Sequence, residues 1–329
     1  MSRRRDLAAF ALTALLFGGT FVAVKAGLAY FPPLLFLAVR FDVGAVVLAG
    51  FALARLSWTD LRPRTAGDVV GVLATGGLVV GLTNALLFLG QQTTSSGVAA
   101  IVFSLNPILT VAAVTSLLPS ERLTRRRLFG TVLGLVGVVF VAGPGSLRRG
   151  EFAGVALLFG GAVTIALGTV LIRWAEPTLS STARTVWGVP LAAALSHGLS
   201  LATGESAAAV TLAPAALAAL VYVGVGSGAV GYLAYFELVD SAGPQGANLV
   251  FYVIPVVSTV GGWALLGESV GPTTLVGFGV VAAGFLAVAS EGVETERLRR
   301  RLPGSRADSS DSSERLADVS SADDASRAD

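Results

Sequence analysis

The hexapeptide ALLFGG at residues 14–19 occurs a second time at residues 156–161. A further set of residues, Pro, Glu, Gly and Gly, also occurs twice in the same order and with the same Glu-to-Gly spacings. The first set is Pro107, Glu121, Gly130 and Gly137, and the second is Pro255, Glu268, Gly277 and Gly284. Both repetitions have nearly the same offset along the chain. Residues 1–146 and 147–290 are therefore predicted to be two related halves, with 291–329 as a separate tail.

The composition predicts that most of this chain is surrounded by lipid. Hydrophobic residues make up 53% of the sequence and charged residues only 13%, whereas a soluble domain has roughly 25% charged residues. The charges separate apolar stretches of about 17–25 residues, the length of a membrane-spanning helix. A transmembrane barrel would instead show segments of about ten residues with alternating polarity. The predicted helices cover 7–29, 33–53, 67–89, 96–118, 128–143, 152–173, 181–203, 213–237, 245–267 and 271–290.

The predicted fold is an all-α, polytopic membrane protein with ten transmembrane helices as two inverted five-helix repeats. Each half has an odd number of spans, so the second half enters the membrane from the opposite side. Inverted repeats of this kind are typical of secondary transporters, whose substrate site lies near the bilayer midplane. A Pro/Gly-rich turn at 143–151 is expected to separate the halves.

The distribution of arginine predicts the orientation in the cell (plasma) membrane. Arg3–Arg5, the loop 55–64 and the cluster 122–127 fall on one side, whereas the loops near 89–96 and 204–212 contain no lysine or arginine. Because cytoplasmic loops carry the excess of basic residues, both termini are expected to be cytoplasmic.

The tail predicted from residue 291 differs in character from the rest of the chain. Several arginines are followed by a mixture of Ser, Asp and Ala with almost no large apolar residues. Such a segment cannot bury enough surface to offset the entropy of ordering it, so the tail is expected to be disordered.

The two repeated sets resemble a known family. The stretch 17–25, FGGTFVAVK, followed by Arg40-Phe41, resembles the opening of EamA-type members of the drug/metabolite transporter superfamily. The two Pro, Glu, Gly, Gly sets resemble the ends of the two EamA repeats. This resemblance over about residues 7–290 implies ten helices and movement of small metabolites, often export of amino acids or related compounds. The two halves differ at one position of this motif, because the second half has Leu167 where the first half has Lys25.

Polar residues inside predicted spans are the candidates for substrate binding, because such residues are costly in lipid. The candidate residues are Lys25, Arg40, Asn84, Asn106, Trp187, Asn248 and Tyr252. Lys25 lies near the outer end of its helix and can extend to the interface, so it is either an interfacial residue or a substrate contact. Arg40 lies deeper, which favours a buried pair or a substrate contact. The asparagines are equally consistent with bridges between helices.

Two prolines within spans, Pro107 and Pro255, predict breaks in their helices, because proline removes a backbone hydrogen bond. Broken helices with free backbone groups are where transporters hold substrates. Asp42 lies on another face of its helix from Arg40 and is expected to pair with a neighbouring helix. Glu121 and Glu268 end equivalent spans, which suits a cap or salt bridge.

Several classes of function have no support in the sequence. The chain has no cysteine, and His197 is its single histidine, so neither a thiolate nor a multi-histidine metal centre is expected. His197 is expected to pack between helices or, alternatively, to be a proton-linked site. No phosphate loop or catalytic triad is present, and the arginines lack the interleaved aromatic residues of a nucleic-acid surface. No enzyme activity, cofactor or nucleic-acid partner is therefore expected.

The predicted function is a secondary transporter of small metabolites that works by alternating access. Coupling to protons or sodium, the substrate and the oligomeric state stay open. The alternatives are a membrane receptor or scaffold that uses the tail, or an intramembrane enzyme. The second would need a convergent catalytic set, for which the sequence offers little.

Overall fold

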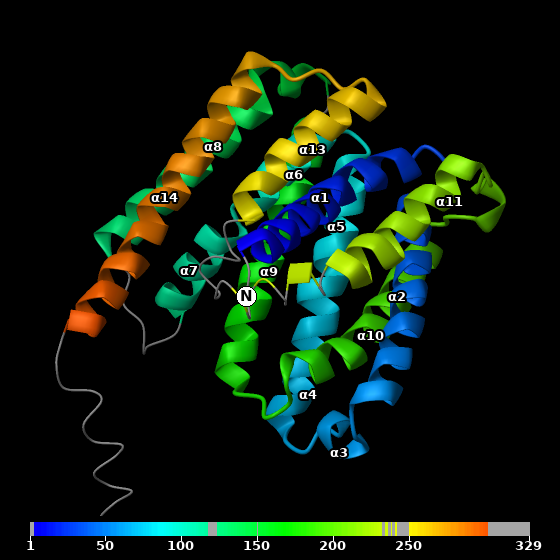
Figure 1. The fold of residues 1–329 in the computed structure, drawn as a ribbon. Coiled ribbons are helices and arrows are strands. Elements are labelled where there is room, and N and C mark those ends of the chain that lie inside the picture. The colour runs from blue at the N-terminus through cyan, green and yellow to red at the C-terminus, as the bar shows by residue number, and fades with distance from the viewer. Residues whose placement is uncertain are drawn as a thin grey trace, which may run out of the picture.

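The computed structural model describes residues 3–117, 124–149, 151–231, 234–235, 238, 241 and 250–301, and all regular secondary structure in this part of the chain is helical (Figure 1). Six helical stretches are long and apolar enough to cross a membrane, and four shorter apolar helices accompany them. The six are Arg5–Gly27, Pro33–Arg55, Ala66–Gln91, Ser96–Leu117, Glu151–Ala175 and Ser181–Ala202; the four are Leu128–Val141, Pro214–Gly228, Val253–Leu266 and Pro272–Gly284. Each falls on one of the predicted spans.

The elements of the first half follow the predicted spans, with interruptions. They are α1 (Arg3–Gly27), α2 (Pro33–Arg55), the short α3 (Trp58–Leu61), α4 (Ala66–Leu73), the π-helical η1 (Ala74–Leu82), α5 (Thr83–Gln91), α6 (Ser96–Phe103), α7 (Asn106–Leu117) and α8 (Arg125–Arg149). Thus α4, η1 and α5 together form one span, and α6 with α7 form the next.

The second half repeats this arrangement. Its elements are α9 (Glu151–Ala175), α10 (Ser181–Ala202), the short η2 (Ala207–Ala209), α11 (Pro214–Val221), the π-helical η3 (Tyr222–Gly231), α13 (Val250–Leu266) and α14 (Pro272–Arg301). The π-helical segments η1 and η3 occupy equivalent places in the two halves, which the sequence did not predict. Such segments are rare and frequently occur at functional sites.

Two expected boundaries differ from the structure. Helix α8 continues to Arg149, so the predicted turn at 143–151 is wrong over most of its length. Within lipid, a continued helix satisfies the backbone polar groups that a turn would leave free. Helix α14 continues to Arg301, eleven residues past its predicted end at 290. Residues 302–329 lie outside the described part, so disorder of the tail stays a prediction.

Equivalent helices of the two halves make equivalent contacts, each with elements of the other half. Figure 1 shows α8 and α14 side by side at one edge and α2 and α10 at the opposite edge. Between these edges, α1 of the first half packs on α13 and η3 of the second. Correspondingly, α9 of the second half packs on α6, α7 and η1 of the first. These equivalent contacts are what a two-fold relation between two repeats produces.

Glycines permit the close contact between α8 and α14. A Cβ atom on Gly137 would lie 2.9 Å from the Gly277 carbonyl oxygen, and one on Gly284 would lie 2.7 Å from the Gly130 carbonyl oxygen. These four residues are the glycines of the repeated sets, and each contact joins non-equivalent members. The two helices therefore run antiparallel, as inverted repeats require, and small residues let their backbones approach.

We predict that Gly277→Ala destabilises the protein, because its Cβ would lie 2.6 Å from the Val141 amide nitrogen and 2.7 Å from the Gly137 carbonyl oxygen. Overpacking of this kind costs about 1–3 kcal/mol. Thermal unfolding in detergent measures the change. The matched control is Gly279→Ala in the same helix, where a Cβ meets nothing within 4 Å, and it should leave the melting temperature unchanged or raise it. Equal effects at both positions would contradict the proposed contact.

Candidate functional site

Arg40 is the charged residue that the structure places inside the bundle beside another predicted site residue. Its Nη1 donates a hydrogen bond of 3.0 Å to Oδ1 of Asn84 on α5. Its guanidinium carbon also lies 5.5 Å from the ring centroid of Phe41 and 5.8 Å from that of Phe88. These distances suit cation–π contacts. Arg40 and Asn84 are both half-buried, so together they form a polar position with aromatic walls.

The local sequence fixes this position. Asn84 donates from Nδ2 to the Val80 carbonyl oxygen at 2.8 Å, which turns its oxygen toward Arg40. The Phe88 ring packs edge-on against Phe36, with centroids 5.4 Å apart. Phe36 is fully buried and stacks on Phe31. A row of aromatic rings therefore holds the wall against which the guanidinium lies.

The structure interrupts the fourth span at Pro107. Helix α6 ends at Phe103 and α7 begins at Asn106. Because Pro107 has no N–H group, the Phe103 carbonyl lacks its regular helical partner. The side-chain Oδ1 of Asn106 is buried and accepts no hydrogen bond within the described part of the chain. A buried acceptor without a partner is costly, so this position suits a ligand that supplies a donor.

Pro255 has a different effect from the one expected, because α13 is helical through it. The proline stands in the second turn of the helix as the structure describes it, and the single backbone bond that it removes does not end the helix. Of the other predicted site residues, Asn248 and the Tyr252 side chain lie outside the described part of the chain. Glu121 lies outside it as well.

Lys25 does not join Arg40 but binds the end of a neighbouring helix. Its Nζ donates to the carbonyl oxygens of Gln91 at 2.8 Å and Gln92 at 3.3 Å, where α5 ends. A cation is favourable there, because helix C-termini carry partial negative charge. Gln91 is fully buried and donates from Nε2 to the Phe21 carbonyl of α1 at 3.0 Å. Helix α1 is thus tied to the end of α5.

Glu268 is confirmed as a helix cap. Both of its carboxylate oxygens accept from the Ser96 amide at 3.0 Å, and one also accepts from the Ser96 hydroxyl at 3.2 Å. Ser96 is the first residue of α6, so a carboxylate of the second half neutralises a helix N-terminus of the first. In addition, Ser258 of α13 donates to the Ser96 carbonyl at 2.8 Å. Lys25 and Glu268 therefore hold the α5–α6 turn from its two sides.

Two further carboxylates, neither of which was predicted from the sequence, connect the halves. Asp68 is fully buried and accepts from the Leu179 amide at 2.8 Å, just before α10. Glu205 accepts from the amides of Leu34 at 3.1 Å and Leu35 at 2.7 Å, at the start of α2. The spacing Thr65-x-x-Asp68 predicts a cap of its own helix, but nothing in the sequence indicates a partner helix in the other half.

The remaining predicted residue, Trp187, lies toward the opposite end of the molecule. Its Nε1 donates to the Leu61 carbonyl oxygen at 2.8 Å, and its ring packs on Trp58. Ten residues farther along α10, roughly 15 Å at 1.5 Å per residue, His197 lies 2.9 Å from a carboxylate oxygen of Asp42 on α2. The expectation that Asp42 pairs with a neighbouring helix is confirmed.

The family of the chain follows from comparison with known sequences. The EamA-like transporter family matches residues 6–143 and again residues 152–290. The chain belongs to the EamA-like transporter family. This confirms the resemblance seen in the repeated sets and makes the protein a multi-pass membrane transporter.

Relatives of this EamA chain include two curated proteins and a solved structure. An uncharacterized transporter of Archaeoglobus fulgidus is 28% identical over 84% of this chain and 96% of its own length. A probable terminal-alkyne amino-acid exporter of Streptantibioticus cattleyicolor is 26% identical over 77% of this chain and 88% of its own length. One crystal structure has a TM-score of 0.57 and 23% identity, over 92% of this chain and 100% of that one. The last likeness shows the fold alone.

We predict that Asn84→Ala lowers the stability of the EamA bundle, because it removes the acceptor of a hydrogen bond from a charged group. Such bonds contribute about 1.5–3 kcal/mol. Thermal unfolding followed by tryptophan fluorescence measures the loss. Asn84→Asp keeps an acceptor opposite Arg40 and should retain most of the stability. If Asn84→Ala melts as the wild type does, the Arg40–Asn84 contact does not organise this part of the bundle.

Proposed function

We propose that this protein is a secondary transporter of small metabolites that exports amino acids or related compounds by alternating access. The observation that carries the proposal is Arg40, held by Asn84 against Phe41 and Phe88 inside an apolar bundle. A positioned guanidinium suits a carboxylate of the substrate, which it can bind through two parallel hydrogen bonds. The aromatic walls suit an apolar side chain.

A second polar position, in the break between α6 and α7, also suits a substrate of this chemistry. The free Asn106 oxygen can accept a hydrogen bond from an amino group, which a carboxylate alone does not offer. The relative named as a probable terminal-alkyne amino-acid exporter agrees with an amino-acid-like substrate. We also propose that all ten predicted spans cross the membrane, with both termini in the cytoplasm, as the arginine distribution indicates.

The contacts at the α5–α6 turn form the gate of the proposed cycle. Lys25 binds the end of α5 and Glu268 the start of α6. Glu268 belongs to the second half, so its release lets α13 move away from α6. In the proposed orientation this gate faces outward. Leu167 replaces the lysine at the equivalent position of the other half, so an inward gate built on the same plan lacks the cation. The two gates therefore differ in strength.

Transport into proteoliposomes tests the function directly. Labelled amino acids and other small metabolites are offered to purified protein, with pH and sodium gradients imposed in turn. We expect saturable uptake, reduced about tenfold or more in Arg40→Ala, because a lost hydrogen bond to a charged group costs about 1.5–3 kcal/mol. Arg55→Gln, which changes an exposed arginine of the same helix, serves as the matched control.

Two outcomes would contradict the proposal. One is equal uptake by Arg40→Ala and Arg55→Gln when both are folded. The other is an absence of uptake for every compound, together with loss of a bound protein partner when residues 302–329 are removed. The second outcome would favour the receptor or scaffold, which depends on the tail, whereas a transporter needs only the helical bundle.

We predict that weakening the gate exposes Ala100, which is buried on α6 one turn beyond Ser96. The chain contains no cysteine, so Ala100→Cys gives a single reporter for a membrane-impermeant thiol reagent. Lys25→Ala or Glu268→Gln should each raise its labelling rate from outside about fivefold or more, because each loses about 1 kcal/mol of charge-assisted bonding.

Glu151→Gln is the control for the gate, since it removes a carboxylate at the start of α9. Because the charge of Glu151 also acts on Lys25, this variant should raise the labelling rate of the reporter, but much less than Glu268→Gln does. If Glu151→Gln accelerates labelling as much as Glu268→Gln does, the rate reports local charge near the reagent and the gate is refuted.

A further inference from the structure

The loop between α2 and α4 has a fixed conformation. The short helix α3 is capped reciprocally by Ser57 and Asp60. The loop is tied to α10 by the hydrogen bond from Trp187 Nε1 to the Leu61 carbonyl. A second capping box, between Thr65 and Asp68, holds the point where the chain enters α4. Contacts within the chain therefore organise this surface.

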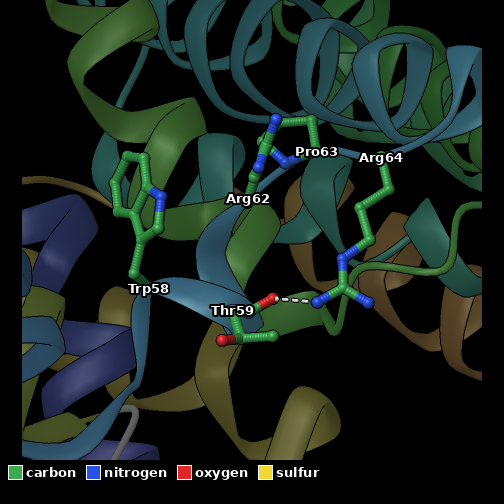
Figure 2. A pocket seen from close by; sticks show the side chains of 5 residues that line it. All are labelled: Trp58, Thr59, Arg62, Pro63 and Arg64. Carbon is green, nitrogen blue, oxygen red and sulfur yellow. Dashed lines mark hydrogen bonds between the residues drawn. The ribbon is translucent and has the colours of Figure 1, made fainter.

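The loop forms a small cavity of about 420 Å³ that is open to the surface and lined by Trp58, Thr59, Arg62, Pro63 and Arg64. Figure 2 shows the Arg64 side chain reaching across to Thr59, where its Nη2 donates to the carbonyl oxygen at 3.0 Å. The guanidinium of Arg62 makes no hydrogen bond or ion pair with any residue that the structure describes. Most of the N–H donors of the two arginines are therefore available to a ligand.

The charge of the loop favours an anion. Residues 55–64 contain three arginines and one aspartate, which gives a net charge of +2. The single carboxylate, Asp60, accepts hydrogen bonds from the Ser57 hydroxyl at 2.7 Å and the Ser57 amide at 3.0 Å. These two bonds, and the charge of Arg64, lower the pKa of Asp60 below its usual value. The carboxylate already satisfies the Ser57 donors, so the arginines supply the donors of the cavity.

The surroundings of the cavity indicate that the anion is carried by a lipid. Trp58 is 67% exposed, and Leu53 on the last turn of α2 is 89% exposed. Exposed tryptophan next to arginine, at the end of an apolar helix, is typical of the membrane–water interface. Guanidinium groups match phosphate oxygens with two parallel hydrogen bonds, and basic pockets at such interfaces bind anionic headgroups.

We propose that Arg62 and Arg64, with Trp58 beside them, bind the headgroup phosphate of an anionic phospholipid. The acyl chains lie along the exposed apolar side of α2, next to Leu53. This site is separate from Arg40 and from the α5–α6 gate, and it is independent of which metabolite is transported. A soluble anion would use the same arginines but would gain nothing from Leu53.

Binding of defined lipids to the full-length protein in uncharged detergent tests the site. The probes are phosphatidylglycerol, phosphatidylcholine with the same acyl chains, and inorganic phosphate. Native mass spectrometry counts the retained lipids, and the melting temperature reports binding. We expect phosphatidylglycerol to be retained and to raise the melting temperature. The double variant Arg62→Gln/Arg64→Gln should bind phosphatidylglycerol about tenfold more weakly than the wild type, or weaker still.

The control double variant is Arg55→Gln/Arg125→Gln, which removes two exposed arginines outside the cavity. It should bind phosphatidylglycerol as the wild type does. Equal weakening in the two double variants would show a general surface charge and overturn the site. If inorganic phosphate raised the melting temperature as much as phosphatidylglycerol does, the proposal that the ligand is a lipid would be overturned. Retention of phosphatidylcholine equal to that of phosphatidylglycerol would overturn the proposal that the lipid is anionic. Trp58→Ala should weaken retention of phosphatidylglycerol while leaving both arginines in place, and unchanged retention would also count against the site.

Discussion

Carboxylates of one half that bind helix N-termini of the other half hold this bundle together. Glu268 caps α6, Glu205 caps α2 and Asp68 binds just before α10. Ser96, Leu34 and Leu179 are buried, so their N–H groups cannot rely on water and require a partner from the protein. Because the partner comes from the opposite half, satisfying the backbone and joining the two repeats become the same interaction. Any relative movement of the halves must exchange or break these bonds.

The two-fold relation also explains features that no single half accounts for. The π-helical segments η1 and η3 each pack on the second-position helix of the other half, where Gly76 meets the Gly188 backbone and Gly224 meets Val43. At the opposite edge, glycines of α8 and α14 permit antiparallel backbone contact. Close contacts occur at both edges of the bundle, and the Arg40–Asn84 hydrogen bond connects α2 at one edge with α5.

The two halves are not identical, and they differ in their charged contacts. Lys25 binds the end of α5, and its counterpart Leu167 is 45% exposed and apolar. Arg40 is held by Asn84 and two phenylalanine rings in the first half. The repeats therefore diverge at the position of Lys25, where only the first half has a lysine that binds the end of a neighbouring helix. The cationic loop around Trp58 adds a contact with the membrane surface that is independent of both.

The sequence by itself determined the helical membrane fold, the positions of the spans, the repeat and the family, because these depend on apolar length and on residue order along the chain. It also identified Arg40, Asn84 and Asn106 as candidates, since polar groups in a span are conspicuous. Only the tertiary structure decided which of them meet. It separated Lys25 and Trp187 from Arg40, and it assigned Asp68 and Glu205 to helices of the other half. Such pairings join residues that are distant in the sequence, and the packing of one half on the other, which no local pattern records, brings them together.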